Sequence, residues 1–423
     1  MQLLRAMYYF FAPYTGPSER AVGVFFRGLT EHSPAHSTRA RLSELLQQDI
    51  AVINLWSEYR YKGYKYLGKR ERKKLYANLQ LIADSFESYR GAYSKDPEEV
   101  MLKIHGIAPG AKLKPEQATT LQALMDYLAP SRGVYEYRES SSFGRLLRNP
   151  ASERLVGDCN QIVTLYVYLY SQYHSVQDLQ IRLLPGHVAL HYGGVDIETT
   201  NGTLANYDDT DGQQLMPIEE IVSVNLLDTT DSYLDTHEVA PEDFLQSARF
   251  AFILSHDRKI VESNLDAAYG RLINQLMKRH NYQKALKLAL ASRDMELLAA
   301  VGNNGALHHM ARHEFAAARR YAKHAIKQTE LIRDSYRAEG AYHYDAGRYQ
   351  EAIKAFRHYG DQELVQKCYE GLFFSEQDKL GKNITTANIK SQAPTIKRMA
   401  NYAQKSGNKQ LIAHASSLKK HLN

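Results

Sequence analysis

Hydrophobic residues recur at helical spacing in the first part of the 423-residue chain. Intervals of three and four residues separate Leu42, Leu45, Leu46, Ile50 and Ile53, and again Leu75, Leu79, Ile82 and Phe86. This spacing places apolar side chains on one face of a helix, so we expect two or more amphipathic helices between residues 36 and 93. Pro115, which suits the first turn of a helix, opens a further predicted helix that runs to about residue 128. Residues 131–150, rich in Ser, Gly and Arg, predict an ordered loop.

The middle of the chain alternates apolar and polar residues with a period of two, which is typical of strands. Gly193-Gly194 divides the segment 184–202 into two such strands and predicts a tight hairpin. Pairing Tyr192 with Val195 gives the further cross-strand pairs His191–Asp196, Ala189–Glu198 and His187–Thr200.

In this register the polar and the apolar side chains of the hairpin separate onto opposite faces. The polar face carries His187, His191, Asp196 and Glu198. Glu198 is the diagonal neighbour of His187 and lies within side-chain reach of it, whereas Asp196 lies beside His191. The hairpin therefore predicts two pairs of a histidine and a carboxylate.

Cys159 stands just before a long apolar run, residues 162–170. The β-branched and aromatic residues of this run favour a strand, but Asp158 and Gln161 have the spacing of a helix capping box. We favour a helix that begins at Cys159 and is buried on all sides. The first turn of a helix has unpaired N–H groups and the positive end of the dipole, which favour a thiolate over a thiol.

The C-terminal third repeats itself. An aromatic residue with Ala three positions later recurs after 33 and then 34 residues, at Tyr282, Phe315 and Tyr349. Small residues upstream, such as Ala306 and Gly340, keep the same register. Roughly from residue 266 to 360 the pattern resembles the tetratricopeptide repeat, which implies stacked helix pairs that bind a protein or peptide. The alternative is a plain helical bundle with accidental spacing.

Three short motifs resemble the transglutaminase-like superfamily. They are Gly157-Asp-Cys159 at the start of the apolar helix, Gly186-His187-Val, and Ile197-Glu198-Thr-Thr-Asn-Gly202. The resemblance covers residues 135–209 and implies a papain-like core with a Cys-His-Asp triad. It makes Cys159 the nucleophile and His187 the base, and Glu198 stands where the family usually has Asp. The superfamily includes acyl transferases, peptidases, amidases and inactive relatives, so the reaction does not follow from the fold.

These parts favour cysteine-dependent acyl transfer or hydrolysis on a protein or peptide amide, through a thioester intermediate. The candidate supporting residues are Asp196, His191, Asp158, Asn160 and Gln161. The alternative is a catalytically inactive transglutaminase-like scaffold that acts in protein-protein interaction. Zinc ligation by the polar face of the hairpin explains the order of the motifs less well than a triad of Cys159, His187 and Glu198 does. We therefore expect no metal and no cofactor.

A turn rich in Asp follows the hairpin at residues 208–212. Tyr207 stands where a calcium-binding EF-hand loop needs its first acid, so we predict a polar turn there.

Charge is distributed unevenly along a chain whose net charge is +6. Residues 183–248 contain thirteen acids and neither Lys nor Arg, which suits a cationic substrate or a basic partner segment, although a solvated surface explains it better. Residues 60–74 contain eight basic residues interleaved with aromatics. A solvated helix face explains this segment better than contact with RNA or DNA, so we expect no nucleic-acid partner.

The composition is that of a globular protein, with 44% hydrophobic and 24% charged residues. The only cysteines, Cys159 and Cys368, exclude a disulfide scaffold and favour a reducing compartment. No apolar run reaches the ~18 residues of a membrane helix, so we expect a cytoplasmic protein without a membrane partner. We expect an α+β protein in four parts: a helical region at 1–130, a transglutaminase-like domain at 131–260, a tetratricopeptide-like α-solenoid at 261–375 and basic capping helices at 376–423.

Overall fold

The computed structural model describes residues 8–140, 142–207, 214–228, 239–380 and 389–422. It is a mixed helix-and-sheet protein, as an α+β class requires. The chain divides into two compact units, Met1–Ala268 and Tyr269–Asn423, and each is described by itself below. The polar turn predicted at 208–212 lies outside the described residues.

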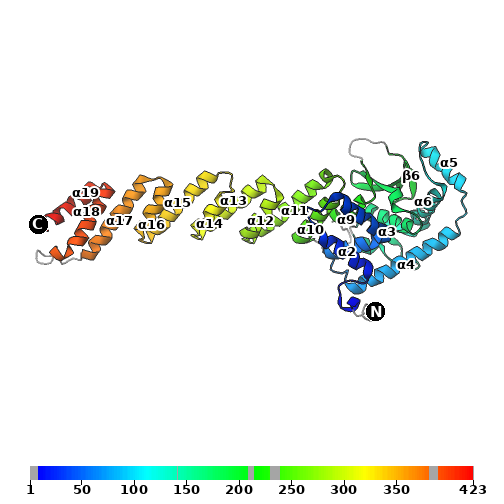
Figure 1. The fold of residues 1–423 in the computed structure, drawn as a ribbon, viewed down its shortest axis with the longest axis horizontal. Helices are drawn as coiled ribbons and strands as arrows, with labels where there is room; N and C mark the ends of the chain where they lie inside the picture. The colour runs from blue at the N-terminus through cyan, green and yellow to red at the C-terminus, as the bar shows by residue number, and fades with distance from the viewer. Residues whose placement is uncertain (1–7, 141, 208–213, 229–238, 381–388, 423) are drawn as a thin grey trace. The chain divides into compact units, whose positions relative to one another are not determined.

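The helices that the sequence predicts between residues 36 and 93 and at 115–128 are present in the first unit, as α3 (Ala35–Arg60), α4 (Lys69–Gly91) and α6 (Pro115–Leu128) (Figure 1). The unit also contains α2 (Pro17–Gly28), α5 (Pro97–Ile107), α7 (Phe143–Leu146), α8 (Cys159–Ser171), α9 (Glu220–Leu227) and α10 (Pro241–Leu254), with single 3-10 turns at η1 (Pro130–Arg132) and η2 (Val176–Asp178). The boundary between the units falls inside α11 (Arg258–Lys278).

Two sheets accompany these helices. A five-stranded antiparallel sheet has the order β6-β5-β4-β3-β7, and β1 pairs with β2 in parallel. The strands are β1 (Tyr135–Tyr137), β2 (Leu155–Gly157), β3 (Leu179–Leu184), β4 (His187–Tyr192), β5 (Val195–Glu198), β6 (Thr203–Ala205) and β7 (Gln214–Pro217).

The segment 131–150 is more regular than the loop that its composition predicts, because it contains β1 and α7. The reason is long-range: the buried Glu58 carboxylate on α3 accepts hydrogen bonds from the backbone N–H groups of Phe143 and Gly144 at the start of α7. Such a contact is invisible to local propensity.

One hydrophobic core joins the helical N-terminal region to the sheet. It runs in sequence from Tyr14 to Leu254 and includes α3, α6, α8 and β3–β5. The predicted boundary at residue 130 therefore falls within this compact unit. Helix α8 lies at the centre of the core, because all ten residues from Gln161 to Tyr170 are buried. The core holds the start of α8 firmly in place.

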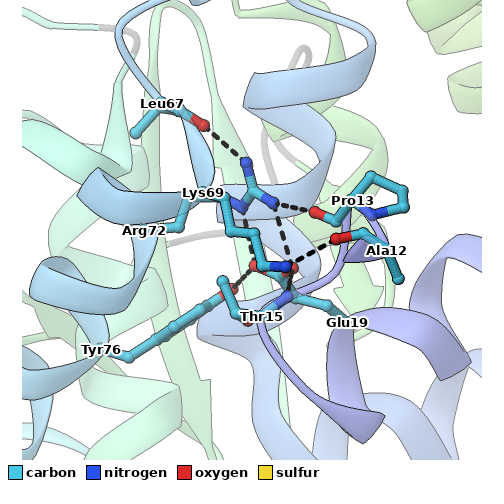
Figure 2. Close-up of polar contacts among 8 residues, drawn as sticks. All are labelled: Ala12, Pro13, Thr15, Glu19, Leu67, Lys69, Arg72 and Tyr76. Carbon is cyan, nitrogen blue, oxygen red and sulfur yellow. Dashed lines mark hydrogen bonds and ion pairs between the residues drawn. The ribbon is translucent and has the colours of Figure 1, made fainter. Parts of the chain in front are cut away.

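A buried polar network ties the segment before α2 to α4 (Figure 2). Arg72 is fully buried, and its Nε lies 2.7 Å from Oε1 of Glu19. Tyr76 donates to the same carboxylate at 2.8 Å, and the backbone N–H of Thr15 donates to it at 2.7 Å. Because every side of the buried carboxylate is satisfied, the pair avoids the free-energy penalty of an unpaired charge.

The same network occupies much of the basic segment 60–74 (Figure 2). Arg72 also donates to the backbone carbonyls of Leu67 and Pro13, and Lys69 donates to that of Ala12 at 2.6 Å. Lys62 is only 2% exposed. Arg72 and Lys62 are therefore buried, and Lys69 is held by backbone carbonyl groups.

The second unit consists of helices in antiparallel pairs (Figure 1). They are α12 (Tyr282–Ser292), α13 (Met295–Ala311), α14 (Phe315–Ala322), α15 (Gln328–Asp345), α16 (Tyr349–Tyr359), α17 (Gln362–Leu380), α18 (Ala393–Ser406) and α19 (Lys409–Lys420), with η3 (Ile389–Gln392) before α18. Each repeated aromatic opens a helix, α12, α14 or α16, and the Ala three positions later is fully buried.

Small residues allow the paired helices to approach closely. A Cβ atom added at Gly340 on α15 would lie 2.5 Å from the Phe356 ring on α16. One added at Gly305 on α13 would lie 2.6 Å from the Tyr321 ring on α14. The recurrence of small and aromatic residues thus reflects the packing between one helix and the next.

None of the helices in the described ranges combines the length and the apolar character that a membrane crossing requires.

Candidate active site

The hairpin formed by β4 and β5 has the predicted register. Gly193 and Gly194 form its turn with φ values of 58° and 98°, a backbone region that glycine adopts without strain. Tyr192 pairs with Val195, and His191 pairs with Asp196. The ladder between β4 and β5 ends at the pair Leu190–Ile197, so it includes neither the expected Ala189–Glu198 pair nor the expected His187–Thr200 pair.

His187 and Glu198 meet on the polar face of this hairpin. The His187 Nε2 atom lies 2.8 Å from the Glu198 Oε2 atom, as expected for diagonal neighbours. The other carboxylate oxygen of Glu198 accepts a hydrogen bond of 2.6 Å from the Tyr207 hydroxyl. Glu198 is thus held from two sides, with one oxygen directed to each partner.

Cys159 is the first residue of α8, and the helix predicted from the capping signal is present. The Asp158 carboxylate caps it by accepting from the backbone N–H groups of Asn160 at 3.0 Å and Gln161 at 3.2 Å. Local capping therefore outweighs the strand propensity of the apolar run. Cys159 is 8% exposed and lines the same pocket as His187.

The histidine connects the thiol to the carboxylate. Its hydrogen bonds to Cys159 and then to Glu198 raise the pKa of His187 to about 10. Burial raises the pKa of the Glu198 carboxyl, but hydrogen bonds from His187 and then Tyr207 outweigh burial and leave that pKa below its ordinary value. At neutral pH the pair is therefore an imidazolium and a carboxylate. An imidazolium has two N–H donors, enough for both neighbours.

A second group of polar residues surrounds the start of α8. The Asn160 side chain accepts a weak hydrogen bond from the Cys159 sulfur at 3.9 Å and donates to Asp228 at 3.2 Å. The Gln161 side chain donates to the Ser140 carbonyl, whereas in a full capping box its oxygen would accept from the backbone N–H of Asp158. Burial, and then the nearby Asp228 charge, raise the pKa of Asp158 to about 7.

The second histidine pair of the hairpin is buried and has different neighbours. The His191 Nδ1 atom lies 2.7 Å from Asp196 Oδ1, and the Arg182 Nε atom on β3 lies 3.1 Å from the same oxygen. The backbone N–H of Tyr207 donates to the other Asp196 oxygen at 2.9 Å. Cys159 and His187 line a common pocket, whereas neither His191 nor Asp196 lines it.

The pocket beside the thiol has a volume of about 380 Å³. Cys159, Asn160 and His187 line one part of it, and the carboxylates that line it belong to Glu220 and Asp228. Its apolar walls are Leu183, Leu184, Val188, Val224, Leu227, Ile260 and Val261. A cavity of this size admits one substituent of a larger substrate to the reacting sulfur.

Nothing in the described part of the chain groups three or more histidine, cysteine or acidic side chains in a way that could hold a metal ion.

Three residues of the site escaped the sequence analysis: Tyr207, Asp228 and Arg182. Tyr207 entered it only as a departure from a calcium-loop pattern. Each of the three reaches its partner through tertiary structure, so spacing along the chain carries no signal for them.

No protein-family model matches the chain, and no curated protein matches it at a significant level.

Proposed function

We propose that the protein catalyses cysteine-dependent acyl transfer or hydrolysis on a protein or peptide amide, with Cys159 as nucleophile, His187 as general base and acid, and Glu198 as the orienting carboxylate. The proposed fold of the first unit is the transglutaminase-like, papain-type core. The helix pairs of the second unit are proposed to be tetratricopeptide repeats that recruit a protein partner. A thiol nucleophile suits a reducing compartment, so the proposed location is the cytoplasm.

One arrangement supports this proposal: His187 is hydrogen-bonded to Glu198 and lines the same pocket as Cys159, and the interaction with Cys159 is the largest cause of its raised pKa. A nucleophile, a base in contact with it and an acid in contact with the base are the arrangement by which a thiol is activated. The elements agree, because the three side chains come from a helix start, a strand and the next strand.

The first half of the reaction forms a thioester. The thiolate of Cys159 attacks the carbonyl carbon of the amide, a C–S bond forms and the C=O electron pair moves to the oxygen. We assign stabilisation of that oxyanion to the backbone N–H of Cys159, which lies in the first turn of α8. The C–N bond then breaks, and His187 gives its proton to the departing amine.

The second half releases the acyl group. His187, now neutral, accepts a proton from water or from an acceptor amine as that nucleophile attacks the thioester carbonyl. The C–S bond breaks and returns the thiolate. Water gives hydrolysis and an amine gives transamidation. Glu198 keeps the imidazole oriented through both halves.

The test is the pH dependence of iodoacetamide labelling at Cys159, followed by peptide mass spectrometry in the native protein and in His187→Ala. N-acetylcysteine in the same solution serves as the ordinary thiol, with half-maximal reactivity near pH ~8.5. We expect the Cys159 profile to lie well below that of N-acetylcysteine, and His187→Ala to move it back.

Cys368 serves as the control for folding. It is fully buried, and burial raises the pKa of its thiol to about 11. It should stay unlabelled as long as the second unit is folded. If Cys159 matches N-acetylcysteine in the native protein, the enzyme proposal fails and the inactive scaffold replaces it.

A further inference from the structure

The second unit contains a large groove that α12 and α14 line. Its volume is about 1080 Å³, and the loop at 279–281 before α12 forms one end. The residues that line it are Arg279, His280, Asn281, Tyr282, Gln283, Leu286, Lys287, Leu290, His309, Arg320, Tyr321, Lys323 and His324. A groove of this volume holds several residues of an extended chain rather than a single side chain.

The charge in this groove has one sign. It is lined by Arg279, Lys287, Arg320 and Lys323, which are all exposed, and by no Asp or Glu. Within the described residues none of these four cations takes part in an ion pair. The acid that approaches a lining residue is Glu314, and His309 and Arg312 hold it. Four uncompensated cations around one concave surface attract an anionic partner.

Apolar surface lies among these cations. Leu290 on α12 is 54% exposed, and Leu286, one turn earlier, also lines the groove. The tyrosine rings, in contrast, are not free: Tyr282 and Tyr321 are buried, and the His309 ring is stacked on Tyr321 at 5.0 Å. Single-stranded nucleic acid binds by stacking bases on free aromatic faces, whereas a peptide inserts apolar side chains between leucines. The groove therefore suits a peptide.

We infer that this groove binds an extended acidic peptide segment, whose Asp and Glu side chains pair with the four cations and whose apolar side chains contact Leu286 and Leu290. The inference rests on the proposed role of the second unit in partner recruitment and names the chemistry of that partner. It does not depend on the reactivity of Cys159.

The test uses the full chain and fluorescence anisotropy. The probe is a fluorescein-labelled dodecapeptide of Asp, Glu and Leu, and its matched control carries Asn and Gln in place of the acids. We expect the acidic peptide to bind at least about tenfold more tightly than the control, and to weaken as salt is raised from 50 to 300 mM. A fluorescein-labelled uridine dodecamer is measured alongside.

Charge reversal locates the site. Arg320→Glu combined with Lys323→Glu should weaken binding of the acidic peptide by about tenfold or more, because attraction becomes repulsion. The matched control combines Lys354→Glu and Lys397→Glu, two exposed lysines of the same unit outside the groove, and should change binding less than twofold. All four substitutions are at exposed positions, and circular dichroism verifies that the helices persist.

Three results would overturn the inference: equal binding of the acidic peptide and its amide control, equal loss in the two double variants, or tighter binding of the uridine dodecamer than of the peptide. Iodoacetamide labelling of Cys159 in the same variants separates this inference from the enzyme proposal. Labelling of Cys159 should be unchanged in both double variants. A negative result for peptide binding would therefore not contradict the enzyme proposal, and a negative labelling result would not contradict the binding site.

Discussion

Two histidine–carboxylate pairs lie on the same face of one hairpin, and their surroundings differ. His187 is paired with Glu198, with a side chain 28% exposed, and lines a pocket with Cys159. His191 is paired with Asp196, with a side chain 8% exposed, and shares that acid with Arg182. His187 and His191 are four residues apart on β4. Because successive side chains of a strand point to opposite faces, both histidines lie on the same face.

The difference is the basis on which we propose one pair as reactive and the other as structural. The histidine and the acid are common to both, and the distances are alike at 2.8 and 2.7 Å. The thiol and the pocket belong to the first pair, whereas the buried arginine belongs to the second. Residue type and distance within a pair are therefore insufficient to assign its role. Our assignment rests on the third residue beside each pair, Cys159 or Arg182.

The largest expected effect is on stability, at the buried pair. Asp196→Ala removes the carboxylate that the buried His191 and Arg182 share, and breaking such a network costs about 3–5 kcal/mol of the free energy of unfolding. Urea unfolding followed by Trp56 fluorescence measures it, because Trp56 is the only tryptophan and lies in the core of the first unit. Glu198→Ala, at the more exposed pair, should cost less. Equal losses would mean that the two pairs do not differ in this way.

The next effect is on reactivity, at the exposed pair. Glu198→Gln removes the charge that keeps His187 protonated and oriented, so alkylation of Cys159 at pH 7 should slow by about tenfold to a hundredfold. Asp196→Asn, the same change at the other pair, should alter the rate less than threefold in protein that remains folded. A larger effect from Asp196→Asn than from Glu198→Gln would reverse the assigned roles.

A smaller effect is expected at Tyr207, which we regard as a positioning residue because it acts through Glu198. Tyr207→Phe removes one hydrogen bond to a carboxylate, worth about 1 kcal/mol, and should slow alkylation of Cys159 by about threefold to tenfold. Because that bond lowers the pKa of Glu198, its loss should also shift the acidic limb of the rate profile upward in pH. Tyr342→Phe in the second unit is the control. An unchanged pH profile in Tyr207→Phe would leave only a structural role.

A further effect is a pH dependence of stability. The pKa of His187 is raised from 6.5 to about 10 in the folded protein, so its contribution is fully present below pH 6.5 and is lost as the pH rises toward about 10. The native protein should therefore exceed His187→Gln in the free energy of unfolding by a margin that shrinks between pH 6.5 and 10. Urea titrations of both proteins across that range measure the margin. A constant margin would show that the imidazolium is not stabilised by folding.

Local rules account for the parts of the site that are close in sequence. The Gly193-Gly194 turn and the alternation around it predict the register, and Asp158 predicts the start of α8. Local rules fail where the interacting residue is far away in the sequence. The segment at 143–146 becomes a helix through Glu58, which lies far away in the chain. The order of the sheet, with β3 between β4 and β7, also depends on tertiary packing.

The central claim, that the pair at His187 and not the pair at His191 activates Cys159, is tested most directly by one experiment. The rate of iodoacetamide labelling at Cys159 is measured from pH 5 to 10 in the native protein, in His187→Ala and in His191→Ala, with an unlabelled Cys368 and native Trp56 fluorescence as evidence of folding. His191→Gln replaces His191→Ala if the latter unfolds. The account predicts that only the His187 change moves the profile up to that of N-acetylcysteine. Equal profiles in all three proteins, or a shift confined to the His191 variant, would contradict it.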